Sequence, residues 1–323
     1  MNAIGGYLEK EPRTIEEHAI PQKDGILLNT GRNAFEYILR FIPNLRGVYL
    51  PYYTCNVMLE PLKRLFGVSL AFYHISHQLE MVEDIELGKG EYIVVNNYFG
   101  IKDEYVSRMA KKYKDRIIID NAQAFYAPVL DGIKAFYSAR KFFGVPDGGI
   151  ACLPNDNKQW ECCEKDNSCD RLEHLTIRIE QGPEAGYAKS REVEGMLDNQ
   201  PIMQMSSYTR DALSHIDYEA AQETRRRNFQ ILHEALHNYN ALPIPDLDSF
   251  ACPMAYPFLD CRKRNWRTAM KEQRIFVPKF WPNVVSYGHL DFEQDMAEYI
   301  MPLPCDQRYG EDDMQRIIDL IKG

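Results

Sequence analysis

RIIIDNAQA, residues 116–124, is the stretch that decides the fold class of this 323-residue chain. It begins with a compact apolar run flanked by charge, which is typical of a buried strand. Asp120 stands where this strand ends, at the sheet edge where α/β proteins place ligands. A second apolar segment, 133–137, leads to Ser138 and, three positions later, to Lys141. The pattern predicts a carboxylate, a hydroxyl and an amine at neighbouring strand ends.

This set of groups fits the cofactor pyridoxal phosphate (PLP). Lys141 would form the Schiff base, Asp120 would pair with the protonated pyridine nitrogen, and Ser138 would help to hold the phosphate. Taken singly, each residue has an ordinary alternative, because strand-end aspartates often cap turns and most lysines are solvated. Their order and spacing together favour a PLP site.

Apolar β-rich segments alternate with single helix-like runs through the first half of the chain. This alternation predicts βαβ units and a mainly parallel sheet. The predicted strands are 48–50, 70–74, 92–97, 116–120, 133–138 and 149–153, and the predicted helices between them are 33–41, 57–66 and 104–113.

The length of the chain suggests two domains. We expect a large domain over 1–239, which would bind PLP, and a smaller C-terminal α/β domain over 240–323. Residues 154–205 are polar and lack clear periodicity, so we interpret them as an irregular excursion over the surface. From 207 to 239 the pattern is strongly helical, and the chain is expected to end in an amphipathic helix over 312–322.

The net charge of −9 argues against a nucleic-acid partner or an anionic membrane. The N-terminus has no signal-peptide core and no apolar run reaches membrane-spanning length, so we expect a cytoplasmic protein. Cys162, Cys163 and Cys169 lie near His174 in the sequence, but their spacing fits no pair of zinc hooks. Reduced thiols are the better interpretation.

A second motif, His233-Glu234-Ala235-Leu236-His237, matches the HExxH signature of zinc peptidases. No third histidine follows at the required spacing, and Leu232, Ala235 and Leu236 indicate a helix used for packing. We therefore expect no metal site and keep a zinc peptidase only as an alternative.

Several motifs together resemble the DegT–DnrJ–StrS group of fold-type I PLP-dependent aminotransferases. Residues 30–34 are similar to the group's Ser-Gly-Thr-x-Ala segment, and 49–55 to its strand and Pro-x-x-Thr turn. Residues 120–124 match its Asp-x-Ala-Gln-Ala segment. The interval from Lys141 to Asp147-Gly148-Gly149 equals that between the group's Schiff-base lysine and its acidic-Gly-Gly turn.

The resemblance implies fold type I, with a three-layer large domain built on a mainly parallel mixed sheet. It implies a homodimer with active sites at the subunit boundary. Lys141 would bind PLP and shuttle protons, and Asp120 would keep the pyridine nitrogen protonated. Gln123 would lie near the phenolic oxygen. The phosphate would be held by the amides of Gly31 and Arg32 at a helix N-terminus, with Ser138 adding its hydroxyl.

Four positions depart from the group's pattern. Where the group commonly has a serine and a histidine before the lysine, this chain has Phe136 and Ser138. Cys55 replaces an aromatic residue that often stacks on the cofactor ring, which leaves Tyr53 and Phe99 as candidates for that contact. The asparagine that the group sends to the neighbouring subunit's phosphate has no clear counterpart.

The expected function is a PLP-dependent aminotransferase that moves an amino group from glutamate to a nucleotide-linked keto-sugar or similar carbonyl compound, as in polysaccharide biosynthesis. Two alternatives remain within the same fold. One is a PLP enzyme of other chemistry, such as a dehydratase, against which the retained Lys141 argues. The other is a non-catalytic regulator.

Overall fold

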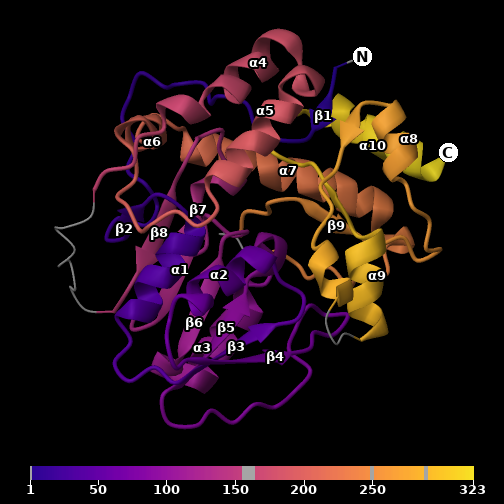
Figure 1. Cartoon of the computed structure of the whole chain (residues 1–323). Helices are drawn as coiled ribbons and strands as arrows, with labels where there is room; N and C mark the ends of the chain where they lie inside the picture. Colours follow the sequence, from indigo (N-terminus) through magenta and orange to yellow (C-terminus); the bar gives the residue numbers. More distant parts are fainter. Residues whose placement is uncertain (1, 155–163, 248–250, 287–289) are drawn as a thin grey trace.

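The larger part of the molecule is built on a seven-stranded mixed sheet, seen in the computed structural model in Figure 1. The structure describes residues 2–154, 164–247, 251–286 and 290–323. The strand order is β2-β8-β7-β6-β5-β3-β4, with β3 to β7 parallel to one another and β2 and β8 antiparallel to their neighbours. The strands are β2 (Ile26–Leu28), β3 (Gly47–Pro51), β4 (Ser69–Tyr73), β5 (Glu91–Asn96), β6 (Ile117–Asn121), β7 (Lys134–Ser138) and β8 (Gly149–Cys152). The predicted α/β class and mainly parallel sheet are confirmed.

Helices cover both faces of this sheet, because successive residues of each strand alternate between two apolar cores. On one face α1 (Gly31–Arg40) and α2 (Leu59–Lys63) pack against Ile118 and Phe136. On the other face α3 (Asp103–Tyr113) and α7 (Tyr218–Leu236) pack against Ile117 and Ile119. The result is a three-layer arrangement.

The segment that precedes α7 corrects one expectation. We expected an irregular excursion over 154–205, but its described part contains the helices α4 (Glu173–Gln181) and α5 (Pro183–Met196), which pack against each other. Gly182, with a φ of +88°, separates them. Few of their residues are buried, so they carry no apolar stripe that a sequence pattern could reveal. A short helix, α6 (Ser207–Leu213), leads on to α7.

The C-terminal part is a smaller α/β unit. An antiparallel pair, β9 (Tyr256–Phe258) and β11 (Met301–Leu303), lies with three helices, which are α8 (Arg267–Glu272), α9 (Asp291–Tyr299) and α10 (Glu311–Lys322). The last helix agrees with the one expected over 312–322. Short 3₁₀ helices occur at Asn56–Met58, Tyr98–Gly100, Lys114–Arg116, Ala139–Lys141, Cys169–Arg171, His237–Tyr239 and Pro282–Ser286.

The N-terminal residues lie with this C-terminal unit. Strand β1 (Ile4–Gly5) pairs in parallel with β10 (Ile275–Phe276), and Figure 1 shows the N-terminus near α8 and α10. Residues 4–5 therefore pair with a strand of the expected C-terminal domain. Two-residue strands are too short for their pairing to be predicted from a pattern. Among the described helices, none is both long and apolar enough to cross a membrane.

Candidate active site

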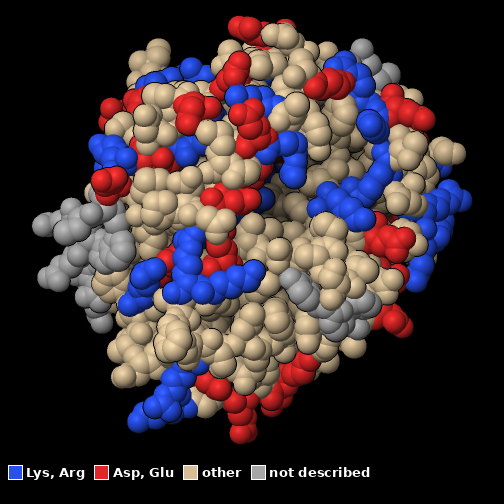
Figure 2. Space-filling model, in the orientation of Figure 1, with Lys and Arg blue, Asp and Glu red and all other residues tan. Residues whose placement is uncertain are grey.

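A pocket opens at the carboxyl ends of the parallel strands. Its wall includes all six residues that the sequence predicted, namely Gly31, Arg32, Asp120, Gln123, Ser138 and Lys141. Its empty space, including the open mouth, measures about 900 Å³. Figure 2, in the orientation of Figure 1, shows a hollow near the centre of the molecule, with Lys and Arg side chains on both sides of it. Asp120, Gln123, Ser138 and Lys141 reach the pocket because the parallel strands β6 and β7 end at this edge. Gly31 and Arg32 reach it at the N-terminus of α1.

Asp120 is the buried carboxylate of the pocket. One of its oxygens, Oδ1, accepts a hydrogen bond from the Ala122 amide at 2.9 Å. The other oxygen has no hydrogen-bond partner among the described residues. Burial raises the pKa of Asp120 to about 6, although the Ala122 amide and the charge of Lys141 act to lower it. Such a carboxylate would ionise more readily beside a cation, and a protonated pyridine nitrogen is a cation of this kind.

The N-terminus of α1 forms the opposite wall. Thr30 caps the helix, because its side chain accepts a hydrogen bond from the Asn33 amide at 3.1 Å. The amides of Gly31 and Arg32 have no intrahelical acceptor. A Cβ at Gly31 would stand 3.3 Å from the Cβ of Ser138, so this glycine lets the helix approach that hydroxyl. Free N–H groups beside a hydroxyl suit a phosphate group.

The Asp147-Gly148-Gly149 turn supports this cradle from behind. The Gly148 amide donates to the Asn29 carbonyl at 2.6 Å, one residue before the helix cap. Gly148 has a φ of +124°, a conformation that favours glycine. The Asp147 carboxylate accepts hydrogen bonds from the amide and hydroxyl of Ser206, both at 2.7 Å, and from the Thr209 hydroxyl. The turn is therefore anchored to α6.

Gln123 and Arg32 are each held by a second contact. Oε1 of Gln123 accepts a hydrogen bond from the Phe99 amide at 2.8 Å. The NH2 group of Gln123 makes no hydrogen bond within the described ranges. The side chain of Arg32 forms ion pairs with Glu60 at 2.6 Å and with Asp198 at 2.8 Å. Gln123 thus keeps a donor for a phenolic oxygen, and Arg32 ties α1 to α2 and to the end of α5.

The two aromatic residues considered as replacements for Cys55 do not reach the pocket. Tyr53 and Phe99 are fully buried in the core and are not part of its wall. Cys55 itself lies on the wall, as does Trp281. Trp281 stacks on Phe280 with ring centroids 5.4 Å apart, and it is the aromatic side chain that borders the pocket next to the C-terminal unit.

No protein-family model and no curated protein sequence matches this chain. Among solved structures, the sugar aminotransferase CalS13 from Micromonospora echinospora is 15% identical, with a TM-score of 0.64 over 98% of this chain and 93% of its own. A DegT DnrJ EryC1 StrS aminotransferase from Brucella abortus is 17% identical, with a TM-score of 0.60 over 93% and 85%. Spr1654 from Streptococcus pneumoniae, assigned to the sugar aminotransferases and solved in its PMP form, is 12% identical, with a TM-score of 0.66 over 98% and 91%.

The chain has the fold of these aminotransferases. This is fold type I of the PLP-dependent enzymes, so the resemblance found in the sequence is confirmed at the level of the fold.

Four further residues of the pocket are not among the predicted site residues. Asn96 ends β5 in register with Asp120, so the argument that found Asp120 applies to it as well. Its Oδ1 atom is buried without a hydrogen-bond partner in the part of the chain that is described. Trp281 lies in an aromatic segment that hints at a pocket. Arg140 and Glu194 gave no signal, because their contact joins parts of the chain with no shared pattern.

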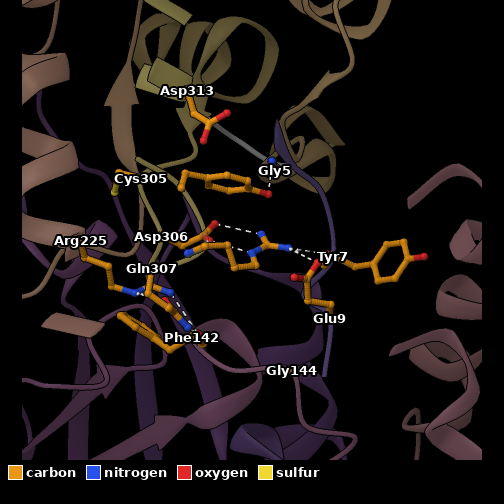
Figure 3. Close-up of polar contacts among 12 residues, drawn as sticks. Gly5, Tyr7, Glu9, Phe142, Gly144, Arg225, Cys305, Asp306, Gln307 and Asp313 are labelled. Atoms are coloured by element: carbon orange, nitrogen blue, oxygen red, sulfur yellow. Dashed lines mark hydrogen bonds and ion pairs between the residues drawn. The ribbon is translucent and has the colours of Figure 1, made fainter. Parts of the chain in front are cut away.

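The loop after Lys141 is held by contacts from α7, from the C-terminal unit and from the N-terminal segment. Figure 3 shows Arg225 and Gln307 directed at Phe142, and the Phe142 carbonyl accepts from Arg225 Nη2 at 3.0 Å and from Gln307 Nε2 at 2.9 Å. The guanidinium of Arg225, which is 1% exposed, also lies 4.5 Å from the Phe142 ring centroid. The Gly144 amide donates to Glu11 at 3.0 Å. These contacts connect the Lys141 loop to α7, to the C-terminal unit and to the N-terminal segment.

The HExxH histidines lie elsewhere, on and just after α7. His233 contacts the Tyr256 hydroxyl at 3.4 Å, and Nδ1 of His237 lies 3.1 Å from the His233 carbonyl. Within the described ranges, no three His, Cys, Asp or Glu side chains are grouped to hold a metal ion. Cys162 and Cys163 fall outside the described residues.

Proposed function

We propose that this protein is a PLP-dependent aminotransferase. The observation that carries the proposal is one pocket in which Lys141 and Asp120 face the N-terminus of α1 and Ser138. An amine that can hold the cofactor, a buried carboxylate with one free oxygen and a cradle of free amides are the three features that PLP requires. The solved structures support it, because aminotransferases share this fold over nearly the whole chain.

Each pocket residue has a role in this proposal. Bound PLP supplies an electron sink that stabilises negative charge on the carbon bearing the amine. Lys141 holds the cofactor covalently and, once released, moves the proton at that carbon. Asp120 holds the proton on the pyridine nitrogen. The amides of Gly31 and Arg32 and the hydroxyl of Ser138 bind the phosphate, and the NH2 group of Gln123 donates to the phenolic oxygen.

The finer parts of the proposal are the substrates and the assembly. We take glutamate as the amino donor and a nucleotide-linked keto-sugar, or a similar carbonyl compound, as the acceptor. The name of CalS13 as a sugar aminotransferase supports this acceptor class. A cytoplasmic homodimer acting in polysaccharide biosynthesis belongs to the same proposal, and sedimentation would test the dimer.

Visible absorption of the purified protein tests the cofactor role of Lys141. With added PLP, the wild-type protein should show a protein-bound cofactor band that glutamate bleaches, and Lys141→Ala should lack it. Lys134→Ala is the matched control, because Lys134 begins β7, the strand that leads to Lys141, and donates to the Asp115 carbonyl outside the pocket. Amination of a keto-sugar, followed by mass spectrometry, then tests the acceptor. A wild-type protein that takes up no PLP would contradict the proposal.

A further inference from the structure

Arg140, the residue before Lys141, places its side chain on the wall of the same pocket. Its Nη2 atom forms an ion pair with Oε1 of Glu194 at 2.6 Å. Glu194 comes from α5, and it too lines the pocket. A cation and a carboxylate that no role in the proposed function requires therefore stand next to the reactive lysine.

The Nε and Nη2 atoms form one edge of the Arg140 guanidinium, and the ion pair with Glu194 uses only Nη2. The Nε atom of Arg140 is buried and has no hydrogen-bond partner among the described residues. Two other arginines of the chain use both Nε and Nη2 to bind the two oxygens of one carboxylate. Nε and Nη2 of Arg262 donate to Asp260 at 2.8 and 2.9 Å, and those of Arg308 donate to Asp306 at 2.7 and 2.9 Å. A carboxylate bound in that way would satisfy the Arg140 edge better than Glu194 does.

Glu194 is placed to give way to such a ligand. The Glu194 side chain is 48% exposed, whereas that of Arg140 is 20% exposed. The glutamate can therefore rotate outward into the solvent while the arginine keeps its position. Burial acts to raise the pKa of Glu194, but the charges of Arg140 and Lys141 outweigh it and lower this pKa to about 2. The group therefore remains an anion and occupies the arginine in the absence of substrate.

We propose that Arg140 binds the carboxylate of the amino donor and that Glu194 is the internal carboxylate which the donor displaces. The inference rests on the proposed function, since it names the recognition group for an amino acid at the same pocket. The phosphate has its own donors at Gly31, Arg32 and Ser138.

The test is calorimetric titration of the PLP-loaded protein with glutarate, a dicarboxylate that matches glutamate in length and lacks the amine. We expect Arg140→Gln and Arg140→Lys to weaken glutarate binding at least about tenfold, since lysine keeps the charge but lacks the fork. Glu194→Gln should tighten it about fivefold, because the internal competitor loses its charge. Glu184→Gln is the matched control, since Glu184 lies on the same helix but pairs with exposed Arg274 at the surface.

The outcomes separate this inference from the proposed function. If the wild-type protein takes up no PLP, the proposed function itself fails. If it takes up PLP but does not bind glutarate, or if Glu194→Gln leaves the affinity unchanged or weaker, the inference is overturned. It is also overturned if the Arg140 variants lose PLP affinity, which would make Arg140 a phosphate ligand. Should the Arg140 variants not fold, Glu194→Gln alone still decides the matter.

Discussion

The carbonyl oxygen of Thr30 lies so close to Gly149 that a Cβ at position 149 would stand 2.0 Å from it. The cap of α1 and the first residue of β8 are thus in direct backbone contact. Because Thr30 begins the helix whose amides form the proposed phosphate cradle, this contact positions the cradle against the sheet.

Gly149→Ala should therefore damage both stability and cofactor binding. We expect a loss of about 3 kcal/mol in the free energy of unfolding, since the new methyl meets a backbone atom that cannot move alone. PLP affinity, measured by absorbance titration, should fall with it. Gly195→Ala is the control, because a Cβ at Gly195 meets nothing within 4 Å and its helix should gain up to about 1 kcal/mol. Equal effects of the two substitutions would refute the role of the contact.

Asp120 should make the stability of the cofactor-free protein depend on pH. Burial raises its pKa from 3.8 to about 6, so the folded protein binds this proton more tightly than the unfolded chain does. The stabilising contribution is then fully present below pH 4 and is lost as the pH rises from about 4 to 6. The loss is at most about 3 kcal/mol, because one pKa unit corresponds to about 1.4 kcal/mol.

Asp120→Asn removes this titration and provides the measurement. In urea unfolding of the cofactor-free proteins, the variant should gain on the wild type between pH 4 and pH 8 by up to that amount. Added PLP should stabilise the wild type more than the variant. A difference in stability that stays constant across this pH range would show that ionisation of Asp120 costs the fold nothing.

Arg225 does not line the pocket, but it should contribute both to stability and to PLP binding through its bond to the Phe142 carbonyl. Arg225→Met removes donors to the carbonyls of Phe142, Pro253 and Met254, which are left buried. We expect a loss of about 3 kcal/mol by urea unfolding and weaker PLP binding, since Phe142 follows Lys141.

Two further variants calibrate that result. Arg227→Met changes the same residue type on an exposed position of α7 and should alter neither quantity. Gln307→Ala leaves the bond from Arg225 to Phe142 in place and should cost only about 1 kcal/mol. If Arg225→Met lowers stability but leaves PLP affinity at the wild-type value, the network supports the fold and not the lysine.

The HExxH motif should have no part in activity. His233 and His237 contact Tyr256 and helix carbonyls in the part of the chain described here. His237→Ala and exhaustive chelation should both leave amination at the wild-type rate, and metal analysis should find less than one zinc per chain. A stoichiometric zinc that His237→Ala removes would revive the peptidase alternative.

The local sequence pattern was sufficient to predict the pocket residues that lie at or just after strand ends. Asp120 and Lys141 follow compact apolar runs that are typical of buried strands, and parallel strands end at one edge whatever the rest of the chain does. The same logic extends to Asn96. It fails for Glu194, because α5 is mostly exposed and shows no apolar stripe, and for β1, because two residues carry no period. Those contacts depend on tertiary packing between distant segments, which a one-dimensional pattern does not encode.

The pairing of β1 with β10 has a consequence for how the chain is made. The Gly5 amide donates to the Tyr309 hydroxyl, 304 positions away in sequence, so Gly5 is synthesised long before its partner. The segment around Gly5 must wait without this partner until the residues around Tyr309 have been synthesised. Glu11, which follows β1 in the same N-terminal segment, accepts a hydrogen bond from Gly144 in the loop after Lys141. The pocket should therefore reach its final form only after the residues around Tyr309 have been synthesised.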